Sequence, residues 1–144
     1  IDTDFYLLSK FKDEKFEIKL NKVINLWEKS SQMISELSKS YQFDYIHVLQ
    51  PNQYFENSKP LTKEEQEISN FKKYEEPIKK YYDKFKIQNI NSKYKFDARY
   101  IFESNNENLY RDYCCHLNNK GMYLLSNNII DKFEDLFISF IQAN

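Results

Sequence analysis

Asp112, Cys114, Cys115 and His116 bring a carboxylate, two thiols and an imidazole together within five positions of the sequence. Side chains of these types can bind a metal ion, act as a nucleophile or transfer protons. Gly121, the only glycine of the chain, follows shortly afterwards. Three kinds of chemistry are therefore open at this stretch, and the spacing of the residues bears on each of them.

A metal site is disfavoured by the spacing. Structural zinc sites usually separate paired ligands by two to four residues, so that both side chains can face one ion. Cys114 and Cys115 are adjacent and therefore point in different directions, and a further ligand would have to come from a distant part of the chain. We predict no metal and no organic cofactor.

The two cysteines are also poor candidates for a disulfide, because a bond between adjacent residues is strained. Cys115 stands beside His116 and ahead of an expected helix, which is a setting that can stabilise a reactive thiolate. Neighbours in sequence rarely meet in hydrogen-bonding geometry, however, and the commoner role of such a cysteine is to pack as a small buried side chain.

Asp112 and His116 suit proton transfer. In acid–base catalysis an imidazole takes a proton from a nucleophile, and a carboxylate orients the imidazole. Residues 112 and 116 lie in an expected loop, where the chain can curl and bring the two side chains together. A loop histidine with a purely structural partner remains the alternative. The other histidine, His47, lies in a predicted strand, and we expect it to be packed and hydrogen-bonded.

The elements around this stretch alternate between helical and extended patterns. Residues 13–40 show three- and four-residue apolar spacing, and residues 43–50 form a β-prone run that ends at Pro51. Thr62 and Glu65 fit a capping box, so a helix should begin near Lys63, with Pro77 kinking it or starting a second one. Residues 95–102 predict another strand. Residues 119–142 predict a helix, with Asn118 at the position where the chain enters it. This order indicates an α/β protein with a parallel sheet.

Two of the predicted helices have marked apolar faces. The first face comprises Phe16, Leu20, Val23, Ile24, Trp27, Ile34 and Leu37, and the last helix carries Met122, Leu125, Ile129, Phe133, Leu136, Phe137 and Phe140. Residues spaced in this way lie on one side of a helix, so we expect both faces to be packed inward.

The overall composition describes one domain over residues 1–144. Apolar residues make up 41% of the chain and aromatic residues 17%, which is enough for a core. The net charge of −1 shows no excess of positive charge, so the composition does not favour binding of nucleic acid. No apolar run approaches the roughly 20 residues that span a bilayer, so no transmembrane segment is expected. Localisation and oligomeric state cannot be read from these features.

The stretches "YIHVLQPNQYFENSKPLTKEE", "FDARYIF" and "LYRDYCCHLNNKGMYLLSNNII" together resemble the C-terminal half of an SGNH (GDSL-type) hydrolase. The resemblance covers residues 13–142 in the order of elements. It implies a three-layer, flavodoxin-like fold, of which this chain would supply about two strands with flanking helices. It also implies that His116 is the general base and Asp112 its orienting acid, and that Gln50 and Asn52 lie at the substrate-binding cleft.

The chain departs from the family pattern at two points. The commoner spacing is Asp-x-x-His, whereas one more residue separates Asp112 from His116, which a bulged turn could absorb. No Gly-Asp-Ser or Gly-x-Asn-Asp block is present, so the serine nucleophile and the oxyanion hole are missing. We therefore expect the C-terminal portion of a longer domain, inactive by itself.

The function implied is that of an ester hydrolase or acyltransferase acting on a small-molecule, carbohydrate or lipid ester. The alternative is a non-catalytic binding or interaction module that keeps part of the fold, for which the abundance of Tyr and Phe is suited. A helical adaptor without a sheet is a third hypothesis, which the β-prone run at residues 43–50 disfavours.

Overall fold

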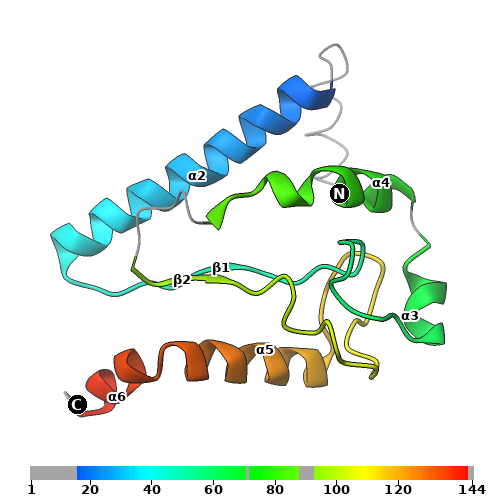
Figure 1. Ribbon diagram of the computed structural model, residues 1–144. Coiled ribbons are helices and arrows are strands. Elements are labelled where there is room, and N and C mark those ends of the chain that lie inside the picture. Colours follow the sequence, from blue (N-terminus) through cyan, green and yellow to red (C-terminus); the bar gives the residue numbers. More distant parts are fainter. Residues whose placement is uncertain (1–15, 71, 88–92, 143–144) are drawn as a thin grey trace, which may run out of the picture.

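The computed structural model describes residues 16–70, 72–87 and 93–142 (Figure 1). The chain forms α2 (Phe16–Tyr41), β1 (His47–Leu49), α3 (Lys63–Ile68), α4 (Lys72–Tyr81), the short 3₁₀ helix η1 (Tyr82–Lys84), β2 (Lys95–Asp97), α5 (Asn119–Lys132) and α6 (Glu134–Gln142). Helices thus combine with a small parallel sheet. The predicted α/β class is confirmed, and the hypothesis of a helical adaptor without a sheet is wrong.

Within the described part of the chain, β1 and β2 pair in parallel, with Val48 opposite Phe96 in the register. The intervening helices α3 and α4 form the crossover that a parallel pair requires. Both strands are shorter than the β-prone runs at 43–50 and 95–102. β2 ends at Asp97 because its carboxylate accepts the backbone N–H of Arg99 and pairs with the Arg99 side chain, which turns the chain.

Helices lie on both sides of the strand pair. Figure 1 shows α2 and α4 on one side and α5 and α6 on the other. The first side is filled by a cluster of Leu49, Phe55, Tyr82 and Ile87, against which Trp27, Ile78 and Phe85 pack. On the second side, the ring of Phe133 meets the rings of Tyr94 and Phe96 edge-on, with centroids 6.0 and 6.3 Å away. These contacts hold the strands between the helices.

The face that α2 turns inward differs from the predicted one. Ser31 and Ser35 are buried, whereas Val23, Ile34 and Leu37 of the predicted apolar face are exposed. Small serine side chains let the helix approach the strand closely, and the Ser31 hydroxyl is hydrogen-bonded to side chains beyond the helix. The prediction from apolar spacing is therefore wrong in part. Residues 13–15 of the predicted helix lie outside the described residues.

Helix boundaries follow local signals in some places only. The capping box is present, with the Thr62 hydroxyl accepting from the Glu65 backbone and the Glu65 carboxylate accepting from the Thr62 backbone. A second helix does follow α3, but it begins at Lys72 and Pro77 lies inside it, so of the two predicted alternatives a helix start at Pro77 is wrong. The predicted helix over 119–142 divides at Phe133, whose N–H donates to the carbonyls of Ile129 and Ile130.

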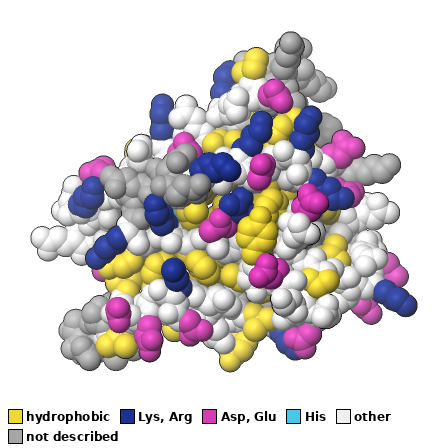
Figure 2. Space-filling view, in the orientation of Figure 1, with side chains coloured by type: hydrophobic (Ala, Val, Ile, Leu, Met, Phe, Trp, Pro, Cys, Tyr) yellow, Lys and Arg dark blue, Asp and Glu magenta, His cyan; other side chains and the backbone are white. Residues whose placement is uncertain are grey.

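The surface carries charges of both signs. On the face drawn in Figure 2, Lys and Arg side chains are interspersed with Asp and Glu, and apolar side chains gather at the level of the strands, between α2 and α5. This face therefore presents no large field of one sign. None of the described helices is both long enough and apolar enough to cross a bilayer.

Candidate active site

Residues 109–118 form a loop that folds back on itself, which we call the 109–118 hairpin. Tyr110 and Leu117 pair as an antiparallel bridge. The N–H of Arg111 donates to the carbonyl of His116 at 3.0 Å, and the N–H of Asn118 donates to the carbonyl of Leu109 at 2.8 Å. In Figure 1 this segment lies at the end of the molecule toward which both strands run. Side chains at the tip of the hairpin are thus placed near the carboxyl ends of the strands, where ligands bind in open α/β sheets.

The hairpin brings Asp112 and His116 together, as their spacing predicted. Nδ1 of the His116 ring lies 2.7 Å from Oδ2 of Asp112. The His116 side chain is 59% exposed and that of Asp112 is 32% exposed. The imidazole is therefore held at one nitrogen by a carboxylate while most of the ring remains open to solvent.

The backbone reverses direction between Asp112 and His116. Oδ1 of Asp112 accepts the N–H of Cys114 at 2.8 Å, which makes a tight turn closed by the aspartate side chain. Cys115 then adopts a left-handed conformation with φ of 66°, which is uncommon for a residue that is not glycine. This combination reverses the chain within five residues and returns the His116 ring to the carboxylate.

The surroundings of Asp112 keep its carboxyl group ionised. Partial burial acts to raise its pKa, but the hydrogen bonds from the His116 ring and from the backbone of Cys114 and His116 outweigh that effect and leave the pKa lowered. A charged carboxylate at Nδ1 favours the tautomer that carries its proton there. Nε2 of His116 is then the nitrogen with a free lone pair, as a general base requires.

The neighbouring thiol is not activated. Burial raises the pKa of Cys115 to about 11, and the nearby Cys114 and Asp112 add to this effect. A thiol with so high a pKa stays protonated near neutral pH and is a poor nucleophile. Cys114 and Cys115 are both free cysteines. Among the described residues, no group of three or more His, Cys, Asp or Glu side chains is arranged to hold a metal ion.

The two residues predicted to line the cleft, Gln50 and Asn52, have different surroundings. Gln50 follows β1 directly, its side chain is exposed, and its amide nitrogen lies 3.7 Å from the sulfur of Cys115 in the hairpin. Asn52 is only 5% exposed, and its side-chain oxygen accepts the N–H of Tyr54 at 3.0 Å. Gln50 therefore borders the Asp112–His116 turn, whereas Asn52 stabilises the turn of its own loop.

Two residues that the sequence did not single out fasten the tip of the hairpin. The side-chain amide of Gln53 donates to the carbonyl of Asp112 at 2.7 Å and to the hydroxyl of Ser69 at 3.1 Å. The hydroxyl of Tyr54 donates to the carbonyl of Tyr113 at 2.6 Å. The loop after β1 thus holds the backbone at two adjacent residues where the turn begins.

The start of α5 supports the hairpin from the other end. The side-chain oxygen of Asn118 accepts the N–H of Gly121 at 2.9 Å, which confirms the predicted helix entry. A Cβ atom at position 121 would lie 2.5 Å from the carbonyl oxygen of Leu109 and 3.1 Å from Cβ of Leu117. Gly121 therefore allows α5 to lie close against the hairpin.

His47 is packed, as predicted. Its Nδ1 lies 2.8 Å from the hydroxyl oxygen of Ser31, and the Trp27 ring meets its ring edge-on at 4.7 Å. Ser31 is almost completely buried, so a substrate has no access to that hydroxyl. Ser31 and His47 are therefore a structural pair.

Comparison of the chain with protein-family models, with curated proteins and with solved structures finds no match. The interpretation of the site therefore rests on the chemistry of the residues and on their geometry.

Proposed function

We propose that Asp112 and His116 are the acid and the base of an SGNH-type ester hydrolase or acyltransferase. The observation that carries the proposal is the 2.7 Å contact between Nδ1 of His116 and Asp112, on an exposed turn. A carboxylate that binds Nδ1 orients the ring and stabilises the imidazolium that forms when Nε2 accepts a proton.

In the proposed reaction, Nε2 of His116 removes the proton of a serine hydroxyl while the serine oxygen attacks the carbonyl carbon of an ester. The same proton then passes to the oxygen of the leaving alcohol, and an acyl-serine remains. Water or an acceptor alcohol attacks the acyl group in the second half-reaction, again with His116 as the base. The substrate class is a small-molecule, carbohydrate or lipid ester. Proton transfer by these groups needs no metal or organic cofactor.

The serine and the oxyanion donors have to come from polypeptide outside these 144 residues. The sequence lacks a Gly-Asp-Ser block, and its one glycine, Gly121, lies in α5. A base without its nucleophile and oxyanion hole provides little transition-state stabilisation, because these groups act as a unit. We accordingly expect the 144-residue chain alone to be inactive and the activity to require a complete α/β layer structure.

The test is carried out on the complete polypeptide encoded around this sequence. We expect an upstream serine turn, labelling of that serine by a fluorophosphonate probe, and hydrolysis of a short-chain acyl ester. His116→Ala should lower turnover by roughly 10⁶-fold, because loss of the histidine from a Ser-His-Asp triad costs about that much. Tyr123→Ala is the control, because the side chain of this tyrosine on α5 is 65% exposed.

Unchanged turnover in His116→Ala would exclude this residue as the base. The absence of a serine turn in the complete polypeptide, together with a lack of probe labelling, would instead favour the non-catalytic binding or interaction module.

A further inference from the structure

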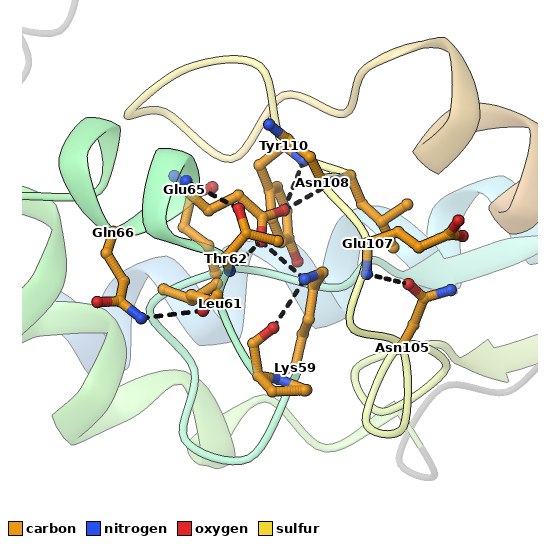
Figure 3. Close-up of polar contacts among 12 residues, drawn as sticks. Lys59, Leu61, Thr62, Glu65, Gln66, Asn105, Glu107, Asn108 and Tyr110 are labelled. Carbon is orange, nitrogen blue, oxygen red and sulfur yellow. Dashed lines mark hydrogen bonds and ion pairs between the residues drawn. The ribbon is translucent and has the colours of Figure 1, made fainter.

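Glu65 is a buried carboxylate that contacts the hairpin as well as its own helix. It lies in the first turn of α3 and is 0% exposed. One oxygen, Oε2, accepts from Nζ of Lys59 at 2.7 Å and from the backbone N–H of Thr62 at 2.9 Å. The other, Oε1, accepts the backbone N–H groups of Leu109 and Tyr110 at 2.7 and 3.0 Å. Figure 3 shows these bonds converging on one side chain.

Helix capping does not explain this arrangement. A capping box uses one carboxylate oxygen and works equally well at an exposed position. Here the Lys59 ammonium is also fully buried, and it donates in addition to the carbonyl of Pro60 at 2.8 Å. Removing two charges from water is costly unless each finds several partners. Burial would raise the pKa of Glu65, but the bonds from Lys59 and from the Leu109, Thr62 and Tyr110 amides outweigh it and leave the pKa lowered.

The two amides that Glu65 binds open the segment that carries the candidate base. Leu109 is bonded across the hairpin to Asn118, and Arg111, which follows Tyr110, is bonded to the carbonyl of His116. Leu109 and Tyr110 are almost completely buried, so their N–H groups have no access to water. Because residues 109–111 are bonded to residues 116–118, holding the first side of the hairpin in place also holds the second side, which begins at His116.

We propose that Glu65 is a positioning residue for the Asp112–His116 pair. Its Oε1 atom sets the hairpin against α3 through the two amides, and Lys59 is the counter-charge that keeps the carboxylate ionised in a buried setting. This role rests on the proposed function, because it is the orientation of the candidate base that Glu65 secures. Glu65 itself does not contact a substrate.

The experiment uses the 144-residue chain and long-range ¹H–¹⁵N NMR of the two histidine rings, at a pH at which imidazole is neutral. In the wild type, Nδ1 of His116 should show the shift of a protonated ring nitrogen, because Asp112 holds its hydrogen. The paired variant Lys59→Met/Glu65→Leu removes both buried charges and leaves the hairpin amides without an acceptor. We expect it to fold, to lose the Nδ1-protonated signature of His116, and to keep the His47 signals.

Rescue separates positioning from general stability. In Lys59→Met/Glu65→Gln the amide oxygen can accept both hairpin N–H groups, so the His116 signature should return. Glu64→Leu is the matched control, because Glu64 is the exposed neighbour in the same helix, and it should leave the signature unchanged.

If the leucine double variant does not fold, Glu65→Asp tests whether Glu65 positions the Asp112–His116 pair. It retains the charge, but its shorter side chain withdraws from the hairpin, so the signature should be lost.

An intact His116 signature in the leucine double variant, or in Glu65→Asp, would overturn the proposal. So would its loss in both double variants, since the glutamine would then have failed to replace the acceptor. The measurement does not depend on ester hydrolysis. Failure of the enzyme assay would refute the proposed function while leaving the link between Glu65 and His116 measurable.

Discussion

The two histidines of this chain are each held at Nδ1 by a hydrogen bond of nearly equal length, but the bonding partner and the solvent exposure of the two rings differ. Nδ1 of His47 lies 2.8 Å from the hydroxyl oxygen of Ser31, and Nδ1 of His116 lies 2.7 Å from the carboxylate of Asp112. Trp27 covers the His47 ring, and burial lowers the pKa of His47. The His116 ring is largely exposed.

The nature of the partner therefore distinguishes the two rings. A hydroxyl can bind a neutral imidazole but does little for an imidazolium, and burial disfavours the charged form further. A carboxylate stabilises the imidazolium, and exposure gives a reactant access to the second nitrogen. His47 is accordingly a neutral packing residue that fastens α2 to β1, whereas His116 has the surroundings of a base.

Of changes to the partners of the two rings, the largest effect is expected for the partner of the exposed ring. In Asp112→Asn the amide NH₂ group can donate to Nδ1, which favours the wrong tautomer and leaves Nε2 protonated. If the proposed function is right, turnover of the complete polypeptide should fall by roughly 10³- to 10⁴-fold, as for the corresponding change in a Ser-His-Asp triad. Steady-state kinetics with a short acyl ester measures this. Asp131→Asn on the exposed side of α5 is the control, and an equal loss there would contradict the specific role of Asp112.

The packing of α5 against the hairpin that carries His116 should be disturbed by a single added methyl group. Gly121→Ala places a Cβ against the Leu109 carbonyl, and overpacking of this kind costs about 1–3 kcal/mol. Alanine gains about 1 kcal/mol over glycine in helix propensity, which offsets part of the loss. Urea unfolding should show a net loss of stability, whereas the exposed Ser126→Ala in the same helix should be neutral or stabilising. A more stable Gly121→Ala protein would show that the hairpin yields to the new side chain.

The packed histidine offers a smaller effect on stability. Ser31→Ala removes the hydroxyl that binds His47 and also lies 3.1 Å from the Tyr45 hydroxyl. Loss of such a bond typically costs about 1 kcal/mol in the free energy of unfolding. Ser40→Ala, at an exposed position near the end of α2, is the control. Under the proposed function, Ser31→Ala should leave ester turnover unchanged, and a large drop would mean that His47 takes part in the chemistry.

The smallest expected effect is a dependence of stability on pH that belongs to His47. Burial lowers its pKa below the ordinary value of 6.5, so the unfolded chain binds the proton more readily than the folded chain. The stability contributed by the neutral ring is fully present above pH 6.5 and is lost as the pH falls toward the lower folded-state pKa. Unfolding between about pH 5 and pH 8 should show this slope in the wild type and a weaker one in His47→Gln. Equal slopes would refute the assignment.

Local signals predicted much of the candidate site. Asp112 and His116 belong to one turn, and Thr62 and Glu65 to one capping box, so short spacing in sequence was enough to indicate both contacts. The contacts of Gln53 and Tyr54 had no such signal. Their acceptors are backbone carbonyls, which every residue carries, and they lie 59 residues further along the chain.

Some features of the fold likewise follow from single residues, whereas others depend on contacts between residues. The end of β1 before Pro51 and the entry to α5 at Asn118 follow from the properties of single residues. The early end of β2 depends on the ion pair between Asp97 and Arg99, which overrides the β-prone sequence that follows. The inward face of α2 depends on the fit of Ser31 to its neighbours, which apolar periodicity does not detect.

The buried carboxylate of Glu65 also bears on the order in which the protein acquires its structure. Its acceptor atoms join the start of α3 to residues 44 and 45 positions later, so a long loop must close before they can be shielded from water. Until then the carboxylate and the Lys59 ammonium remain hydrated. Closure of this loop therefore docks the hairpin against α3 and removes both charges from water in a single step.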